Sequence, residues 1–428
     1  MIKLHPIPNS DFHCPHDNQQ LQVITWYIPG MRNLADLKCL LCGREYYGDL
    51  QAGQALYTPL LLEKNSGKVY DPFNVSWFAD WFQKSYANRS NKPLDFSEEK
   101  FRPLQRPLLL NCLDTLYGHS LLKLLNAQYY IDHRPDLDLI VLIPKIFRWM
   151  IPDGVTAIWT VDLPLKQGIE WNDWLGAEIY KRLEKYKEVY LSVAYSHPHP
   201  QDISIKRFTR VRPFSDISWN NQVPVISYIW RDDRTWVSTS GIGFKRVIEQ
   251  KIRTTNLGKK LSFYQQRSKV IKLANFLKKK FPQIDFAIVG LGEKGDFPKW
   301  IKDMRTKEVN TDIEREWCGR YGESNVIIGV HGSNMLLPSA HAGTVVELVP
   351  EDRWGNIIQD LLMEDLDCRE SLYRFRLIPI NISPQELSII VSTLIEKYLT
   401  IVQLMRRSNL QHISNDPMVK PGIVESKK

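Results

Sequence analysis

The chain has 428 residues, a formal net charge of +8, 43% hydrophobic residues and 24% charged residues. A length above roughly 250 to 300 residues exceeds what one hydrophobic core organises, so at least two large domains are expected. The ordinary composition excludes a disordered chain, and the lack of any fixed-period repeat excludes a solenoid or propeller. The basic balance suits anionic partners such as nucleotide phosphates, lipid headgroups or nucleic acid, and a merely soluble basic surface is an equal alternative.

The location of the protein is predicted from what the chain lacks. No apolar run reaches the roughly 18 residues that a transmembrane helix needs, and residues 1–20 are too polar for a signal peptide. Six cysteines in so long a chain do not form a disulfide framework, and reduced thiols fit the cytoplasm. We therefore expect a cytoplasmic protein without a transmembrane segment.

The N-terminal segment, residues 1–70, carries two cysteine motifs. Cys14-Pro-His16-Asp17 and Cys39-Leu-Leu-Cys42-Gly43 resemble the two knuckles of a zinc ribbon, in which tight turns supply four tetrahedral ligands. The first knuckle holds a single cysteine, so His16 or Asp17 must complete the site, with His13 less favoured. We expect structural zinc on Cys14, His16, Cys39 and Cys42, folding a segment too small for its own core. The alternative is a turn with two reduced thiols.

A first alternation of strands and helices occupies residues 71–215. Apolar, strand-like runs are predicted at Pro107–Cys112, Leu137–Ile143, Val155–Val161 and Val189–Tyr195. Helices are predicted between them, at Ser120–Tyr130 and Trp171–Lys187. Such alternation indicates a parallel sheet covered by helices, which here means a Rossmann-like domain.

A polar, proline-bearing stretch from His197 to Gln222 is the predicted linker, and a second alternation follows over residues 220–385. The predicted strands are Val223–Trp230, Phe286–Gly290, Val326–Val330, Thr344–Val349 and Phe375–Ile380. Val270, Leu273, Ala274 and Leu277 have the spacing of an amphipathic helix. Ser383-Pro-Gln-Glu386 is a capping box that starts a closing helix, and residues 386–428 form this helix and a flexible tail.

The segment around Gly332 is the most informative part of the chain. The buried strand predicted at Val326–Val330 is followed by His331, by Gly332, which permits close approach to the backbone, and by Ser333 or Asn334 as a helix N-cap. Unpaired N–H groups at such a helix start attract a diphosphate. Glu347, in the next strand, is a candidate to accept hydrogen bonds from ribose hydroxyls. The competing interpretations are an ordinary loop histidine and a surface carboxylate.

These residues also carry a resemblance to a known family. Gly329-Val-His331-Gly-Ser-Asn334 with Val345-Val-Glu347-Leu resembles the signature of glycosyltransferase family 61, and Tyr117-Gly-His119-Ser-Leu-Leu is similar to the family's N-terminal Tyr-x-His-x-Leu-Leu segment. A weaker likeness is the strand that ends in Arg231 and Arg234. The sequence departs from the family where Ser333 leads straight to Asn334 and where Thr235-Trp236 follows the arginines, so the donor sugar does not carry over.

The resemblance implies two facing Rossmann-like domains of the GT-B type, an acceptor domain followed by a donor domain. It implies transfer of a sugar, with inversion and without a catalytic metal, from a nucleotide-diphosphate donor to the hydroxyl of a glycan or other acceptor. A UDP-sugar is the first expectation for the donor. His119 is the candidate base or acceptor-positioning group, and a capping or packing histidine is its equal alternative. Arg231, Arg234, His331, Gly332, Ser333, Asn334 and Glu347 are the candidate donor-binding residues. Polysaccharide biosynthesis is the expected pathway, by analogy.

The sequence is also compatible with other classes of function. Asp136-Leu-Asp138 and Asp365-Leu-Asp367 match the D-x-D pattern of metal-dependent transferases, but Asp136 and Asp138 precede an apolar run instead of following it. A zinc ribbon on a basic chain also suits a non-catalytic nucleic-acid-binding protein, although no RNA-binding aromatic motif or basic recognition helix is present, and no nucleic acid is expected as a partner. A heptosyltransferase-like enzyme or a nucleotide-sugar epimerase is the nearer alternative.

Overall fold

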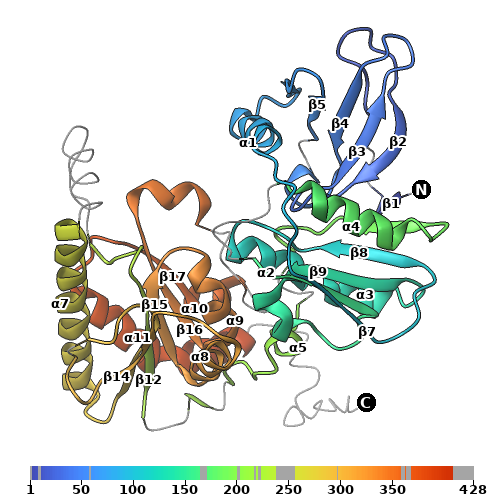
Figure 1. Ribbon diagram of the computed structural model, residues 1–428. Helices are drawn as coiled ribbons and strands as arrows, with labels where there is room; N and C mark the ends of the chain where they lie inside the picture. Colours follow the sequence, from blue (N-terminus) through green and yellow to red (C-terminus); the bar gives the residue numbers. More distant parts are fainter. Residues whose placement is uncertain are drawn as a thin grey trace, which may run out of the picture. The chain divides into compact units, whose positions relative to one another are not determined.

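The computed structural model describes residues 2–7, 11–56, 59–163, 171–199, 203–215, 218–219, 223–237, 256–295, 297–357, 362 and 368–407. The chain forms two compact units, Met1–Arg210 and Val211–Lys428. Their boundary falls inside the stretch predicted as a linker. Each unit contains a six-stranded sheet in which most or all strands are parallel, and the first unit adds a five-stranded antiparallel sheet (Figure 1). The protein is therefore a mixed α/β protein.

The parallel sheet of the first unit contains the four strands predicted there. Its order is β1-β11-β8-β9-β10-β7, in which only β7 is antiparallel to its neighbour. The strands are β1 (Ile2–His5), β7 (Phe96–Lys100), β8 (Pro107–Asn111), β9 (Asp138–Pro144), β10 (Ala157–Val161) and β11 (Val189–Ser192). The edge strands β1 and β7 were not predicted, because both are short and have no continuous apolar run. The chain runs outward from β8 to β10 and then returns to β11, so the strand order switches between β8 and β11.

Both helices predicted in this unit differ in extent from the prediction, and α5 (Ile205–Thr209) was not predicted. The single helix expected at 120–130 is two helices, α2 (Tyr117–Leu125) and α3 (Ala127–His133). Asn126 separates them, and its side-chain amide donates to the carbonyl oxygens of Leu122 and Lys123 at 3.2 and 3.0 Å. An asparagine that bonds the backbone in this way competes with a continuing helix, which explains the break. Two further helices are α4 (Asp173–Leu183) and α5 (Ile205–Thr209).

The N-terminal segment forms the antiparallel meander β2-β3-β4-β5-β6, followed by α1 (Ser76–Ala87). Its strands are β2 (Gln22–Tyr27), β3 (Leu34–Lys38), β4 (Glu45–Asp49), β5 (Leu61–Glu63) and β6 (Val69–Tyr70). Trp26, Leu37 and Tyr46 of the meander pack in the same hydrophobic cluster as Leu109 and Trp159 of the parallel sheet. The meander therefore shares its core with the parallel sheet and does not need a core of its own.

The sheet of the second unit has the order β14-β13-β12-β15-β16-β17, and all its strands are parallel. The strands are β12 (Val225–Arg231), β13 (Asp285–Leu291), β14 (Lys302–Thr306), β15 (Val326–Val330), β16 (Thr344–Val349) and β17 (Phe375–Pro379). Counted along the unit, this is the doubly wound order 3-2-1-4-5-6, whose switch point lies between β12 and β15. The predicted bounds of β15 and β16 are confirmed. The polar edge strand β14 was not predicted.

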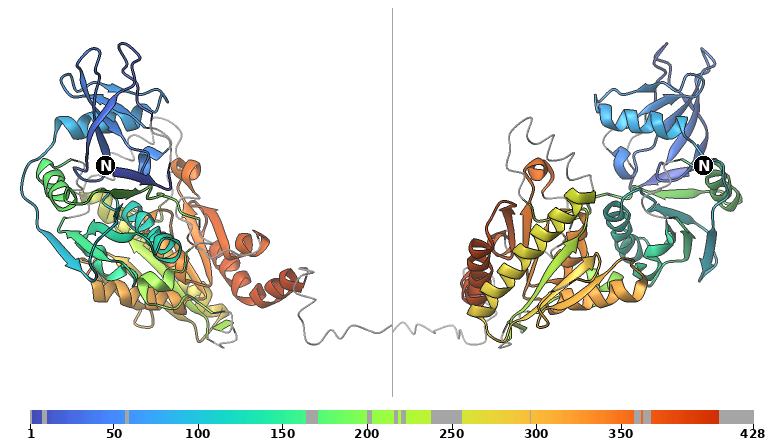
Figure 2. Two further views of the ribbon diagram at one scale, coloured as in Figure 1. Left: turned by 90° about the vertical axis from the view of Figure 1, so that its right-hand side faces the viewer. Right: turned by 60° about the vertical axis from the view of Figure 1, so that its left-hand side comes forward.

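Helices cover both faces of this sheet (Figures 1 and 2). Residues of α7 (Asn256–Lys280) and α11 (Pro384–Arg407) share a core cluster with side chains of β12, β13, β15 and β16. Arg320 of α8 (Thr311–Glu323) reaches Ser227 on the other face, at 3.1 Å. The predicted capping box is present, since Ser383 N–H donates to the Glu386 carboxylate at 3.1 Å and Glu386 N–H donates to Ser383 Oγ at 3.2 Å.

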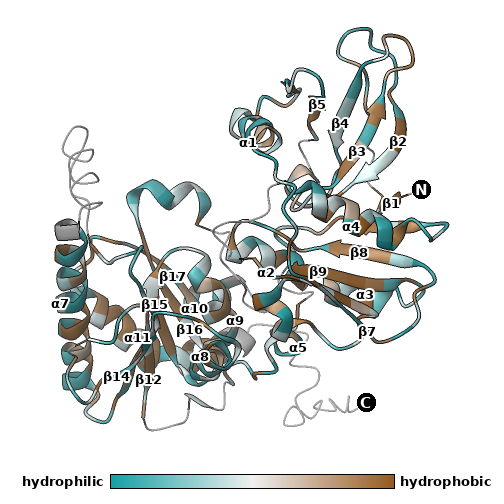
Figure 3. Ribbon diagram, viewed as in Figure 1, coloured by the Kyte–Doolittle hydropathy of each residue, from teal (hydrophilic) through white to brown (hydrophobic). Residues whose placement is uncertain are grey.

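The distribution of apolar side chains follows these layers. Strands β9 and β15 are strongly hydrophobic (Figure 3). In α7, by contrast, hydrophobic and hydrophilic residues alternate along the helix (Figure 3). Within the described part of the chain, no helix combines the length and the apolar character that crossing a membrane requires.

Candidate functional site

The candidate donor site lies in the second unit, at the carboxyl ends of β12 and β15. These two strands flank the switch point, which is where open parallel sheets bind ligands. Arg234 follows β12 and His331 follows β15, and Arg234 Nη1 donates a hydrogen bond of 2.8 Å to the main-chain oxygen of His331. The contact joins two of the predicted site residues, although 97 positions separate them in sequence.

Gly332 is required at this contact for two independent reasons. Its φ of +144° lies in the region that side chains rarely adopt. A Cβ atom at this position would also lie 1.1 Å from Arg234 Nη1. The guanidinium group therefore sits directly against the glycine backbone, and any other residue would displace it.

Behind this loop, His331 is paired with Glu347. His331 Nδ1 lies 2.5 Å from Glu347 Oε2, and the two side chains are 2% and 0% exposed. The His331 N–H also donates to Leu348 O at 3.0 Å, so both the ring and the backbone of His331 are fixed to β16. Because Glu347 faces the imidazole and not the solvent, its carboxylate positions His331, whose main chain in turn holds Arg234.

The helix start after Gly332 differs from the prediction. A short 3-10 turn, η6 (Ser333–Met335), precedes α9 (Leu336–His341), and the N-cap of the turn is Gly332 with no side-chain capping bond. Ser333 or Asn334 was expected there. Asn334 Nδ2 instead donates to Val330 O at 3.3 Å, and its Oδ1 is buried without a hydrogen-bond partner among the described residues. The reason is local: the φ of Gly332 turns the chain before the serine, so the serine already lies inside the turn.

Arg231, the other predicted arginine, is at the last position of β12. Its guanidinium makes two parallel hydrogen bonds of 2.8 Å to Asp233. A bidentate carboxylate neutralises much of its charge. Of the two predicted arginines, Arg234 is the one held at the glycine loop.

The first unit holds a second polar cluster at the corresponding place, after β8 at the switch point of its sheet. His119 Nδ1 lies 3.2 Å from Asp114 Oδ1, and Lys123 Nζ lies 2.8 Å from Asp114 Oδ2. The Asp114 and Lys123 side chains are 0% and 2% exposed, whereas that of His119 is 28% exposed. His119 is therefore the member of the cluster that can reach a ligand.

The charge of this cluster is balanced. Burial by itself raises the pKa of Asp114, but the Lys123 ammonium and the hydrogen bond from His119 outweigh burial and hold the pKa well below its usual range. Asp114 is thus ionised at neutral pH. This ionised carboxylate lies beside Nδ1 and orients the imidazole of His119.

The N-terminal cysteines do come together as a cluster that could hold a structural metal. One ligand atom from each of Cys14, Asp17, Cys39 and Cys42 lies within 4.8 Å of all the others. The distance from Cys14 Sγ to Cys42 Sγ is 3.7 Å and that from Cys39 Sγ to Asp17 Oδ2 is 3.3 Å. Sulfur and oxygen ligands at about 2.3 and about 2.0 Å from a tetrahedral zinc ion are about 3.5 to 3.8 Å apart. The residues therefore fit a tetrahedral ion.

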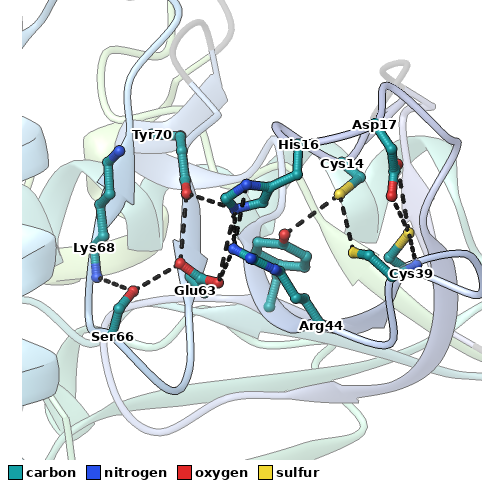
Figure 4. A network of polar contacts seen from close by, with 11 residues as sticks. Cys14, His16, Asp17, Cys39, Arg44, Glu63, Ser66, Lys68 and Tyr70 are labelled. Atoms are coloured by element: carbon teal, nitrogen blue, oxygen red, sulfur yellow. Dashed lines mark hydrogen bonds and ion pairs between the residues drawn. The ribbon is translucent and has the colours of Figure 1, made fainter.

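The fourth member of this cluster is Asp17 and not His16, which corrects the expected ligand set. His16 instead contacts Arg44 Nη1 and Tyr70 Oη, the latter at 3.0 Å, and these groups surround Glu63 (Figure 4). The first knuckle is a turn closed by the bond from Asn18 N–H to Cys14 O at 2.9 Å, with Asn18 at a φ of +59°. This turn directs the side chain of residue 17 towards the cysteines and that of residue 16 away from them.

The aspartates of the D-x-D patterns have other partners. Asp138 Oδ2 accepts hydrogen bonds from the backbone N–H groups of Gln105 and Arg106, and Asp136 pairs with Arg134 and Arg106. Both aspartates lie at the amino end of β9, away from the carboxyl edge where parallel sheets bind ligands. Asp365 and Asp367 lie outside the described residues.

Two functional candidates were missed in the sequence, namely Asp114 and Lys123. The signal for Asp114 was present, because it lies soon after the end of the apolar strand β8, as His331 lies after the end of β15. Lys123 gave no signal, because a lysine in an amphipathic helix normally faces solvent. Neither a protein-family model nor a curated protein sequence matches this chain.

Proposed function

We propose that the protein is a glycosyltransferase that transfers a sugar from a nucleotide-diphosphate donor to an acceptor hydroxyl. The observation that carries the proposal is the contact of Arg234 with the His331–Gly332 loop at the switch point of the second unit. There a guanidinium and a side-chain-free backbone meet at the edge where parallel sheets bind ligands. The resemblance of this loop to glycosyltransferase family 61 supports sugar transfer over other nucleotide chemistry.

In this proposal the diphosphate of the donor lies against Arg234 and the backbone N–H groups of Gly332 to Asn334. These groups stabilise the negative charge that develops on the leaving diphosphate. Arg231 has a lesser role in this proposal, because its guanidinium is already paired with the Asp233 carboxylate. Glu347 acts through His331, which it holds in place beneath the loop.

His119 is the proposed base in the first unit. Its Nε2 accepts the proton of the acceptor hydroxyl while that oxygen attacks the anomeric carbon, and the bond to the diphosphate breaks on the opposite face, which inverts the anomeric configuration. Asp114 positions the ring and stabilises the imidazolium that forms. The two parallel-sheet units then contribute the acceptor and donor halves of a GT-B-type enzyme, with a UDP-sugar as the first donor to test.

We also propose that the metal of the N-terminal cluster is zinc. Three thiolates and one carboxylate form the kind of donor set that zinc prefers over magnesium or calcium, and four protein ligands leave no position for a reacting water. Cys14 and Cys39 are buried in the core that the meander shares with the parallel sheet. Such an ion supports the fold and takes no part in transfer.

The proposal is tested by thermal unfolding of the full chain with UDP, GDP, ADP and the matching nucleotide sugars. A ligand at 100 times its dissociation constant stabilises the folded state by about 2.7 kcal/mol. We expect one nucleotide to raise the unfolding temperature and Arg234→Ala to abolish that rise. Lys302→Ala is the matched control, because Lys302 is an exposed cation at the amino end of β14 in the same sheet.

The same nucleotide sugar is then assayed for release of its nucleotide diphosphate in the presence of glycan acceptors. We expect release by the unaltered chain and no release by His119→Ala, which should still bind the donor. If no nucleotide shifts the unfolding temperature and oligonucleotides do, the chain is a nucleic-acid-binding protein and the transferase proposal fails.

A further inference from the structure

A pocket of about 370 Å³ opens in the first unit, next to the carboxyl ends of β1 and β11. The polar and aromatic residues that line it are Asn126, Tyr129, Tyr130, Tyr195, His197 and His199. It lies at the edge of a parallel sheet at which ligands bind, and its volume is within the usual range for small-ligand sites.

The chemistry of the pocket wall favours a neutral polar ligand with an apolar face. Tyr129 and Tyr195 are 44% and 39% exposed, so their rings are available for contact. The imidazoles of His197 and His199 supply polar ring nitrogens, and none of the described lining residues is Asp, Glu, Lys or Arg. Burial lowers the pKa of His197, and the proximity of His119 acts in the same direction, so the neutral form of His197 is favoured. A phosphate or a carboxylate would find no matching cation here.

The pocket is also built before any ligand arrives. Asn126 Nδ2 donates to Tyr195 O at 2.8 Å, and Tyr130 Oη donates to His5 O at 2.6 Å. Ala194, just after β11, has a φ of +51°, a left-handed conformation that is uncommon for alanine and that sets the direction of the chain into Tyr195. Walls held in this way lose little entropy on binding, which favours affinity for a small ligand.

We propose that this pocket binds a pyranose ring of a neutral glycan. The C–H groups on one face of a pyranose carry partial positive charge and match the negative face of a tyrosine ring. The sugar hydroxyls meet the imidazoles of His197 and His199 in the pocket wall. Leu125 of the pocket wall is the last residue of α2, the helix that carries His119. The bound glycan is then the acceptor; this last step, unlike the binding itself, rests on the proposed function.

The test measures saccharide binding by the full chain with isothermal titration calorimetry and saturation-transfer NMR. The saccharides are methyl β-glucopyranoside, methyl β-galactopyranoside, methyl β-xylopyranoside and their β-linked disaccharides. We expect at least one saccharide to bind. Tyr129→Ala and Tyr195→Ala should each weaken its binding by about tenfold, the loss expected for one aromatic contact, and Tyr129→Phe should retain it. Tyr180→Ala is the control, because Tyr180 is equally exposed at 39% and lies on α4 of the same unit, outside the pocket lining.

Three outcomes would overturn the proposal: no saccharide binds, binding is unchanged in both alanine variants, or uridine binds in a Tyr129-dependent manner while saccharides do not. Arg234→Ala separates this proposal from the proposed function, because that change should leave saccharide binding intact. Saccharide binding without any nucleotide binding refutes the transferase and leaves the glycan site standing. Nucleotide binding without saccharide binding refutes the glycan site and leaves the transferase proposal standing.

Discussion

Each unit brings a histidine against a carboxylate at the carboxyl edge of a parallel sheet, but the two pairs differ in burial and in charge. His331 and Glu347 of the second unit are 2% and 0% exposed and lie 2.5 Å apart. His119 of the first unit is 28% exposed, and its partner Asp114 is also bound by the buried ammonium of Lys123. A pair formed by a histidine and a carboxylate therefore occurs in two different settings.

The difference teaches which histidine is able to act on a ligand. A fully enclosed imidazole cannot exchange a proton with a substrate, so His331 acts through its backbone oxygen, which holds Arg234. An accessible imidazole with an ionised carboxylate behind it has the arrangement of a general base. The motif that looked more specific in the sequence thus contains a buried histidine, and the weaker one contains the exposed histidine that we propose as the base.

The largest expected effect comes from removing the proposed metal, which should destabilise the first unit, where the cysteine cluster lies, and not the second. Structural zinc contributes about 10 to 16 kcal/mol in zinc-finger peptides, and we expect a loss of at least about 5 kcal/mol here because the meander retains a shared core. Chelation or Cys39→Ser should increase hydrogen exchange in the first unit and leave the second unchanged. Cys112→Ala, at another buried cysteine of the first unit, is the control. Purification of a metal-free chain of equal stability would contradict this expectation.

The next effect distinguishes the two carboxylates. Asp114→Asn leaves Lys123 buried without a matching charge and should lower the free energy of unfolding by about 3 to 5 kcal/mol. The double variant Asp114→Asn with Lys123→Met should recover much of that loss. Glu347→Gln should cost only about 1 to 3 kcal/mol, because the glutamine side chain keeps a hydrogen-bonding oxygen opposite His331. Urea denaturation measures the free energy of unfolding of all three variants. Equal losses for Asp114→Asn and Glu347→Gln would show that the two carboxylates do not differ in their contribution to stability.

The two histidines should also separate in kinetics. His119→Ala should lower kcat on the order of 10²- to 10⁴-fold, as expected for loss of a general base, with the KM for the donor little changed. His331→Ala should raise the KM for the donor, because the loop that holds Arg234 loses its support. Asp114→Asn is expected to follow His119→Ala in kcat. A fall in kcat that is the same for His119→Ala and His331→Ala would assign no separate role to His119.

The smallest effect concerns Asp49, whose carboxylate lies 2.7 Å from Arg32 near the same buried lysine. Burial raises its pKa to about 6, although Arg32 and Lys123 act in the opposite direction. A raised folded-state pKa adds stability that is complete below the unfolded pKa of about 3.9 and is lost as pH rises through about 6. The unaltered chain should therefore gain roughly 1 to 3 kcal/mol relative to Asp49→Asn between about pH 7.5 and about pH 4.5. No change in this difference would show that Asp49 titrates normally.

The sequence by itself determined the alternation of strands and helices and the capping box at Ser383. It also marked β15 and β16 to the residue, because a buried parallel strand needs a continuous apolar run that local sequence displays. The edge strands β1, β7 and β14 needed the tertiary structure, since their pairing depends on the strand beside them and not on their own apolar content.

Only the tertiary structure decided how the polar residues are used. Asp17 replaces His16 in the cysteine cluster because the turn at Asn18 sets which side chain faces inward. Glu347 meets His331, and Asp114 meets His119 and Lys123, because adjacent strands and the helix behind them bring these groups together. Residue type and spacing show which chemistry is available, but burial and the facing charge decide which group carries it out.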